Sequence, residues 1–141
     1  MDRVIFACVH NAGRSQMAAA FFNALANPGK AQAISAGTRP GSQVHPEVVA
    51  VMGEIGIDLS QARPQRLTAE FAKGATLLVT MGCGDECPAV PGAAREDWPL
   101  PDPKGLGLIE VRGIRDEIRK RVAALVAARQ WGAAAQPRGP R

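Results

Sequence analysis

The stretch of sequence that decides the fold is residues 4–15, VIFACVHNAGRS. It begins with a continuous apolar run, Val4–Val9, which is typical of a strand buried on both faces of a parallel sheet. The run gives way to a short loop that contains Asn11 and Gly13, two residue types that tolerate tight turns. A helix is predicted to follow over residues 14–26. A buried strand that leads through a short loop into a helix indicates an α/β protein.

The rest of the chain continues this alternation. Further strands are predicted over residues 31–36, 75–81 and 93–98, and further helices over residues 46–56, 68–73 and 108–131. The pattern predicts a three-layer α/β sandwich, in which helices cover both faces of a four-stranded parallel sheet. The expected strand order is 2-1-3-4, as in flavodoxin-like folds. We expect residues 1–131 to form a single domain and residues 132–141 to form a flexible C-terminal tail.

Apolar residues at helical spacing mark the inner faces of the predicted helices. In the helix over residues 14–26 they are Met17, Phe21, Phe22 and Leu25, and in the helix over residues 46–56 they are Val48, Val49, Met52 and Ile55. The final helix carries a longer stripe of Val111, Ile114, Ile118, Val122, Leu125 and Val126. We expect these side chains to pack against the sheet.

Composition narrows the range of functions. The chain has 141 residues, of which 46% are hydrophobic and 21% are charged, so it is long and apolar enough for one globular core. No apolar run reaches the roughly 18–20 residues of a membrane span, and the N-terminus lacks the apolar core of a signal peptide. The net charge of +4 could attract nucleic acid, but aromatic residues make up only 4% of the chain and Tyr is absent. The chain therefore has few side chains on which the bases of a single strand could stack. We therefore expect a cytoplasmic protein that binds neither nucleic acid nor a membrane.

The loop after the first strand has the chemistry of an anion site. Cys8 lies at its start, and the backbone N–H groups of a loop that enters a helix converge on negative charge. The residues predicted to bind an oxyanion are Val9, His10, Asn11, Ala12, Gly13, Arg14 and Ser15. Cys8 is expected to be a thiolate nucleophile, with Arg14 pairing two oxygens of the anion and the Ser15 hydroxyl donating to the thiolate. The alternative is that Cys8 is an inert core thiol and Arg14 a surface residue.

This Cys-x5-Arg-Ser loop, placed between a buried strand and a helix, resembles the low-molecular-weight tyrosine phosphatases and the arsenate reductases built on the same fold. The resemblance covers roughly residues 3–130. Other stretches that resemble the arsenate reductases are SAG at 35–37, VHP at 44–46, IDLS at 57–60 and RGIRDEI at 112–118. The resemblance implies a phosphatase-like fold that carries a thiol-dependent arsenate reductase.

The chain has three cysteines, and in a reducing cytoplasm they are free core residues, metal ligands or reactive groups. Cys83 and Cys87 lie in the stretch TMGCGDECP at residues 80–88, after the third predicted strand. In the order 2-1-3-4 the first and third strands are neighbours, so we expect Cys83 beside the Cys8 loop. Cys87 is close enough along the chain to pair with Cys83. Two alternatives stay open, namely a Cys87 that is only buried and a zinc site formed by Cys83, Cys87 and His10 or His45.

A leaving oxygen needs a proton, so a carboxylic acid is expected to face the Cys8 loop. Asp102-Pro103 resembles the Asp-Pro general acid of the phosphatase-like fold, and the neighbouring prolines stiffen that segment. Asp97 is the alternative acid. The alternative role for Asp102 is that of a solvent-exposed turn residue.

The resemblance implies the reduction of arsenate to arsenite. Cys8 attacks the bound arsenate, Asp102 protonates the departing oxygen, and Cys83 then attacks the Cys8 sulfur. Cys87 takes over the disulfide, which thioredoxin or a low-molecular-weight thiol reduces, and no metal or bound cofactor is required. Three other functions stay open: a phosphatase acting on phosphotyrosine, an arsenate–thiol transferase that needs only Cys8, and a non-catalytic binder of arsenite or zinc.

Overall fold

The fold is that of a computed structural model, which describes residues 1–82 and 89–132. Its four strands are β1 (Asp2–Cys8), β2 (Ala31–Gly37), β3 (Leu77–Thr80) and β4 (Ala94–Asp97). They form one sheet in the order β2-β1-β3-β4, and every neighbouring pair is parallel. The predicted α/β class, strand count and strand order are therefore confirmed.

The central strand is β1, which pairs with β2 on one side and β3 on the other. Residues 4–8 of this strand are all buried, as the apolar run predicts. In the pairing register, Cys8 lies opposite Gly37, Ala7 lies opposite Thr80, and Thr80 lies opposite Asp97. The carboxyl ends of all four strands therefore meet at one edge of the sheet, where parallel sheets bind their ligands.

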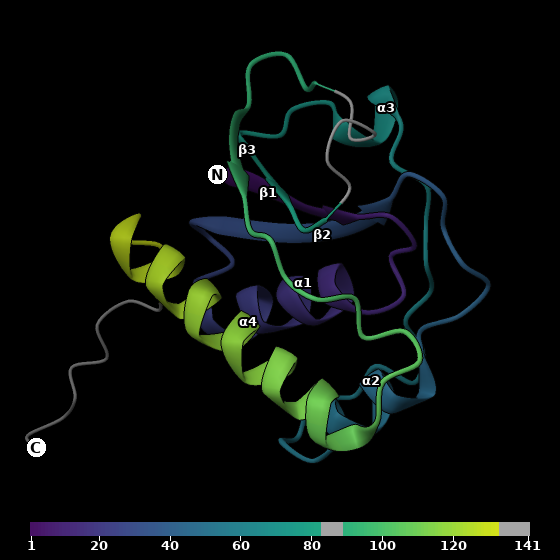
Figure 1. The fold of residues 1–141 in the computed structure, drawn as a ribbon. Helices are drawn as coiled ribbons and strands as arrows, with labels where there is room; N and C mark the ends of the chain where they lie inside the picture. The colour runs from purple at the N-terminus through teal and green to yellow at the C-terminus, as the bar shows by residue number, and fades with distance from the viewer. Residues whose placement is uncertain (83–88, 133–141) are drawn as a thin grey trace, which may run out of the picture.

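Helices cover both faces of the sheet, as predicted (Figure 1). One face carries α1 (Arg14–Leu25), α2 (Pro46–Gly53) and α4 (Leu108–Ala128), and α4 packs against the other two. The larger core lies on this face and includes Phe6, Phe22 and Ile118. The other face carries the short helix α3 (Ala69–Ala72), whose first turn is capped by the Thr68 hydroxyl. A smaller core there includes Ile5, Leu67 and Leu78.

The final helix is shorter than the predicted 108–131 and ends at Ala128. Gln130 adopts a left-handed conformation, with φ of 57°, which a helix cannot continue through. The chain turns back at Trp131, whose ring packs edge-on against Phe22 with 5.6 Å between ring centroids. The Trp131 indole N–H donates to Asp2 Oδ2 at 3.0 Å. Gly132 pairs with Ala26, and the rest of the predicted tail, residues 133–141, lies outside the described residues.

The helix predicted over residues 46–56 ends earlier, at Gly53, and a turn follows in which Gly56 is left-handed, with φ of 84°. Arg115, from α4, binds this end of the helix. The Arg115 guanidinium donates to the Val51 carbonyl at 2.8 Å and to Glu54 Oε1 at 3.0 Å. Such a contact satisfies a carbonyl that the end of a helix leaves without a partner.

Three core predictions need correction. Val51 is buried, whereas Val49 and Ile55 are only partly buried, because the helix turns a slightly different face to the core. Leu25, the last residue of α1, is 38% exposed. None of the helices in the described ranges combines the length and apolar character that a membrane span requires.

Candidate active site

The loop between β1 and α1 is held from outside by the segment that follows β2. Four of its carbonyl oxygens accept hydrogen bonds of 2.8–3.2 Å from backbone N–H groups of residues 38–45, namely those of Cys8, Val9, His10 and Ala12. Within the described ranges, no residue accepts a hydrogen bond from the N–H groups of residues 12–15. The loop therefore turns its carbonyls outward and leaves donors at the amino end of α1, an arrangement suited to an anion.

Cys8 ends β1 and is 2% exposed. Its Sγ lies 2.9 Å from Ser15 Oγ and accepts the Asn11 N–H at 3.3 Å. Asn11 has φ of 51°, so it takes the left-handed conformation that the sequence permits at this position. Gly37, opposite Cys8, is needed for the close approach of this loop, because a Cβ there would lie 2.6 Å from the Val9 carbonyl oxygen.

Arg14 is buried, contrary to the alternative that places it on the surface. Its Nη1 donates to the Leu100 carbonyl at 3.0 Å, and a Cβ on Gly82 would overlap the guanidinium. Its Nε is buried and has no hydrogen-bond partner among the described residues. An unpaired buried donor carries a desolvation cost that an oxyanion would relieve.

The structure distinguishes the two candidate acids. Asp102 Oδ2 lies 3.8 Å from Arg14 Nη2, and its Oδ1 accepts the Lys104 N–H at 3.0 Å. Asp97 instead accepts a hydrogen bond from the Thr80 hydroxyl, which, with the nearby Arg95 cation, holds the pKa of Asp97 below its usual value. A general acid must be protonated before it reacts, so a lowered pKa disfavours Asp97 in that role.

The segment that carries Asp102 packs directly on the loop of Cys8. A Cβ on Gly13 would lie 2.5 Å from Pro103 Cγ and 3.5 Å from the His45 ring. His10 and His45 line one pocket of about 230 Å³ together with Lys104. The absence of a side chain at Gly13 therefore lets the two loops touch.

Cys83 and Cys87 lie outside the described residues. Gly82, the residue before Cys83, lies two residues beyond the end of β3, and a Cβ on it would overlap the Arg14 guanidinium. The Met81 N–H donates to the Ala7 carbonyl at 2.7 Å, so the chain reaches residue 82 beside the end of β1. The expectation that Cys83 and Cys87 act with Cys8 stays a prediction.

Sequence analysis missed Gln16, which is 7% exposed and lies behind the loop. Its amide nitrogen donates to the Asn11 carbonyl at 3.1 Å, to Asn11 Oδ1 at 3.2 Å and to the Arg63 carbonyl at 3.1 Å. The only signal in the sequence is a glutamine in the first turn of a helix whose next residues are apolar. A glutamine in that position is equally compatible with a solvent-exposed side chain.

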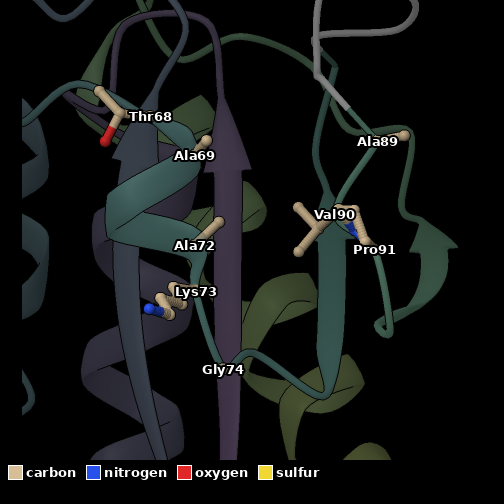
Figure 2. A pocket seen from close by; sticks show the side chains of 8 residues that line it. All are labelled: Thr68, Ala69, Ala72, Lys73, Gly74, Ala89, Val90 and Pro91. Atoms are coloured by element: carbon tan, nitrogen blue, oxygen red, sulfur yellow. The ribbon is translucent and has the colours of Figure 1, made fainter.

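An apolar pocket of about 330 Å³ lies on the other face of the sheet (Figure 2). Val90 points across it toward Ala69 and Ala72 of α3, and Lys73 is the one charged residue among the described residues that line it. The lining includes no residue of the Cys8 loop. This apolar pocket is therefore separate from the loop that carries Cys8.

Comparison with known families decides the identity of this arrangement. Residues 3–133 match the family described as low molecular weight phosphotyrosine protein phosphatase. The chain belongs to this family. The Cys-x5-Arg loop of residues 8–14 lies within the matched range, and the structure places it between the end of β1 and the start of α1.

Several proteins that are similar to this chain are named arsenate reductases. A Halobacterium salinarum protein provisionally named arsenate reductase is 41% identical over 125 residues, which are 85% of this chain and 87% of that protein. The glutaredoxin arsenate reductase of a Synechocystis species is 36% identical over 130 residues, covering 90% of this chain and 98% of that protein. The solved structure of a thioredoxin-dependent arsenate reductase from Corynebacterium glutamicum matches with a TM-score of 0.80 and 38% identity. That match covers 92% of this chain and 62% of the Corynebacterium chain.

Proposed function

We propose that this protein is a thiol-dependent reductase that converts arsenate to arsenite. The observation that carries the proposal is the contact set of Cys8, whose sulfur faces both the Ser15 hydroxyl and the Asn11 N–H. Two donors aimed at one sulfur stabilise a thiolate, which is the nucleophilic form. The names of the relatives supply the substrate, because arsenate is the oxyanion on which they act.

Binding of arsenate follows from the open donors of the loop. The N–H groups of residues 12–15 and the unpaired Arg14 Nε all lie at the amino end of α1. A tetrahedral oxyanion offers an acceptor to each of them, and the guanidinium can pair two of its oxygens at once. Val9 and His10 complete the predicted cradle on the side of β1.

The chemical steps balance with two thiols per arsenate. The Cys8 thiolate attacks arsenic, and a hydroxyl group of arsenate leaves as water after accepting a proton from Asp102. Cys83 then attacks the Cys8 sulfur, the sulfur–arsenic bond breaks, and its electron pair stays on arsenic as arsenite departs. Arsenic gains two electrons, and Cys8 and Cys83 become a disulfide that Cys87 exchanges to Cys83–Cys87.

An external thiol must return the protein to its reduced form. The Corynebacterium relative is named as thioredoxin-dependent and the Synechocystis relative as a glutaredoxin arsenate reductase. We propose thioredoxin or a similar thiol reductant for this chain as well. The proposed reaction uses only protein thiols and the reductant, so it requires no metal and no bound cofactor.

Phosphatase activity is the second candidate, because the family that matches residues 3–133 is a phosphatase family. It would use the same Cys8, Arg14 and Asp102 on a phosphate ester. It differs in one respect, since Cys83 and Cys87 are then dispensable. Hydrolysis of an aryl phosphate that persists in a C83S/C87S variant would favour this candidate.

A single turnover tests the proposed function. The reduced protein is freed of reductant and mixed with arsenate, and free thiols and arsenite are then counted. We expect one arsenite and the loss of two thiols per chain, and neither change in a C8S variant. Three intact thiols with no arsenite would contradict the relay, and arsenite that forms only when a small thiol is added would favour the transferase.

A further inference from the structure

We propose that Gln16 is a positioning residue, whose side-chain amide fixes the turn at Asn11 and thereby the orientation of Cys8. The inference rests on the proposed function only in taking Cys8 as the nucleophile. The Asn11 carbonyl is an exception among the carbonyls of the Cys8 loop. The carbonyls of residues 8–10 and 12 are bound by the segment over residues 38–45, whereas the Asn11 carbonyl is bound by Gln16.

One nitrogen of Gln16 serves three oxygens. Nε2 lies within 3.2 Å of the Asn11 carbonyl, Asn11 Oδ1 and the Arg63 carbonyl, and the residue is 7% exposed. An amide nitrogen carries two hydrogens, so these three acceptors share two donors. In a buried place each unmet acceptor is costly. A side chain without donors at this position would leave the Asn11 and Arg63 carbonyls without this partner, and Asn11 Oδ1 with the Gln65 N–H alone.

Gln16 binds Asn11 in a left-handed conformation, with φ of 51°. Asparagine enters this region more readily than most residues that carry a side chain, and its hydrogen bonds help to keep it there. Two hydrogen bonds hold the side chain of Asn11, because its Oδ1 accepts from the Gln16 amide and, at 2.9 Å, from the Gln65 N–H. Among the residues that the structure describes, Gln16 is the one that binds both oxygens of Asn11.

Short hydrogen bonds connect Asn11 to the Cys8 sulfur. With Oδ1 bound from behind, Asn11 Nδ2 points forward and donates to Ser15 Oγ at 2.7 Å. Ser15 Oγ accepts that bond, so its own hydrogen is free for the Cys8 sulfur 2.9 Å away. The Asn11 N–H, set by the same turn, donates to that sulfur as well. Loss of the Gln16 amide therefore weakens both donors to Cys8.

The test replaces the amide while keeping its length. Q16M removes both donors, and Q16E replaces them with oxygens that repel the three carbonyl-type acceptors. The matched controls are Q32M and Q32E, because Gln32 is an exposed glutamine that donates only to the Pro28 carbonyl. The first readout is the rate of iodoacetamide alkylation at Cys8, followed at pH 7 by mass spectrometry of the Cys8 peptide. The others are kcat and KM for arsenate and the melting temperature.

We expect Q16M to slow alkylation of Cys8 and to lower kcat by roughly three- to tenfold, the effect of one or two lost hydrogen bonds. Q16E should have the larger effect, KM should change little, and both Gln32 variants should match the wild type. Alkylation and kcat of Q16M within twofold of the wild type would overturn the proposal. So would a loss seen mainly in KM and melting temperature, which is what general loosening of the fold predicts.

Two further results keep the outcome clear. If Q16M does not fold, Q16N serves instead, because it keeps the amide but draws its nitrogen back by one methylene. If the wild type is alkylated at Cys8 in a Gln16-dependent way yet does not reduce arsenate, the proposed function fails and this inference stands. If arsenate is reduced equally well by wild type and Q16M, this inference fails and the proposed function stands.

Discussion

Asp102 Oδ2 lies 3.8 Å from Arg14 Nη2, so the segment before α4 and the loop before α1 meet at an ion pair. The two partners differ in exposure, since the side chain of Arg14 is 7% exposed and that of Asp102 is 43% exposed. The buried cation is fixed by the Leu100 carbonyl, whereas the carboxylate can reach solvent. A group that is anchored near the oxyanion and open to water suits the exchange of a proton.

Removal of the Asp102 carboxyl tests its role as general acid. We expect D102N to lower kcat for arsenate by roughly 100-fold, the smaller end of the usual effect of general acid catalysis. D97N is the control and should keep kcat within about threefold, because the Thr80 hydroxyl already holds Asp97 in its ionised form. Steady-state kinetics of both variants measure this, and a larger loss in D97N than in D102N would reverse the assignment.

A methyl group at Gly13 should separate the two loops. The added Cβ of G13A would lie 2.5 Å from Pro103 Cγ, so the Asp102 segment must shift. We expect kcat to fall roughly tenfold or more, since a displacement of about 1 Å at a catalytic group is costly. G53A is the matched control, because a Cβ there meets nothing within 4 Å and a helical Ala should raise the melting temperature. Full activity in G13A would show that the contact does not matter.

Exchange of Arg14 for Lys keeps the charge and removes the planar fork. We expect R14K to weaken the binding of inorganic phosphate by roughly tenfold or more, because a lysine cannot pair two oxygens in one plane. Isothermal titration calorimetry with phosphate measures the change. R66K is the control, since Arg66 is exposed and donates to the Thr38 carbonyl at 3.2 Å. Equal phosphate affinity in R14K and wild type would place the anion elsewhere.

The ion pairs of Glu54 predict a pH dependence of stability. Hydrogen bonds from Arg112, and then from Arg115, hold the pKa of Glu54 below its usual value of 4.5. A carboxyl whose pKa is lowered by folding stabilises the protein above its unfolded pKa, and that contribution is lost as pH falls through the folded pKa. E54Q should therefore melt below the wild type at pH 7, and the two curves should converge below pH 4.5.

The control for that experiment is E70Q, on the opposite face of the sheet, which should show no such convergence. A constant difference between wild type and E54Q across the whole pH range would mean that the charge of Glu54 is not what stabilises the end of α2.

The order of elements was predictable because a few strong local signals agree. The run of Val4–Val9 is too apolar for a strand with an exposed face, and the polar loop after it can only lie at the carboxyl edge of a parallel sheet. The ends of the helices were less predictable. Nothing in the sequence shows that Gln130 turns left-handed, because the cause is the burial of Trp131 against Phe22, more than 100 residues away.

The candidate site was predictable where residue type alone decides the chemistry, as for Cys8 and Arg14. It was not predictable where tertiary contact decides. The Asp-Pro pattern favours Asp102 over Asp97 in the sequence, but only the fold shows that Asp102 lies beside Arg14 and that Asp97 is bound by the Thr80 hydroxyl. Gln16 has a role only through the Asn11 and Arg63 oxygens, which lie together because the chain folds back behind the loop.

The hydrogen bond between Asp2 and Trp131 has a practical consequence for handling the protein. Both residues lie at the start of β1, and Cys8 lies at its end, about 20 Å away at 3.3 Å per residue. A fluorescent label or surface tether attached at residue 1 would therefore lie at the opposite end of β1 from the sulfur. Immobilised in this way, the protein presents Cys8 and the carboxyl edge of the sheet to solution, where the proposed redox partner can approach them.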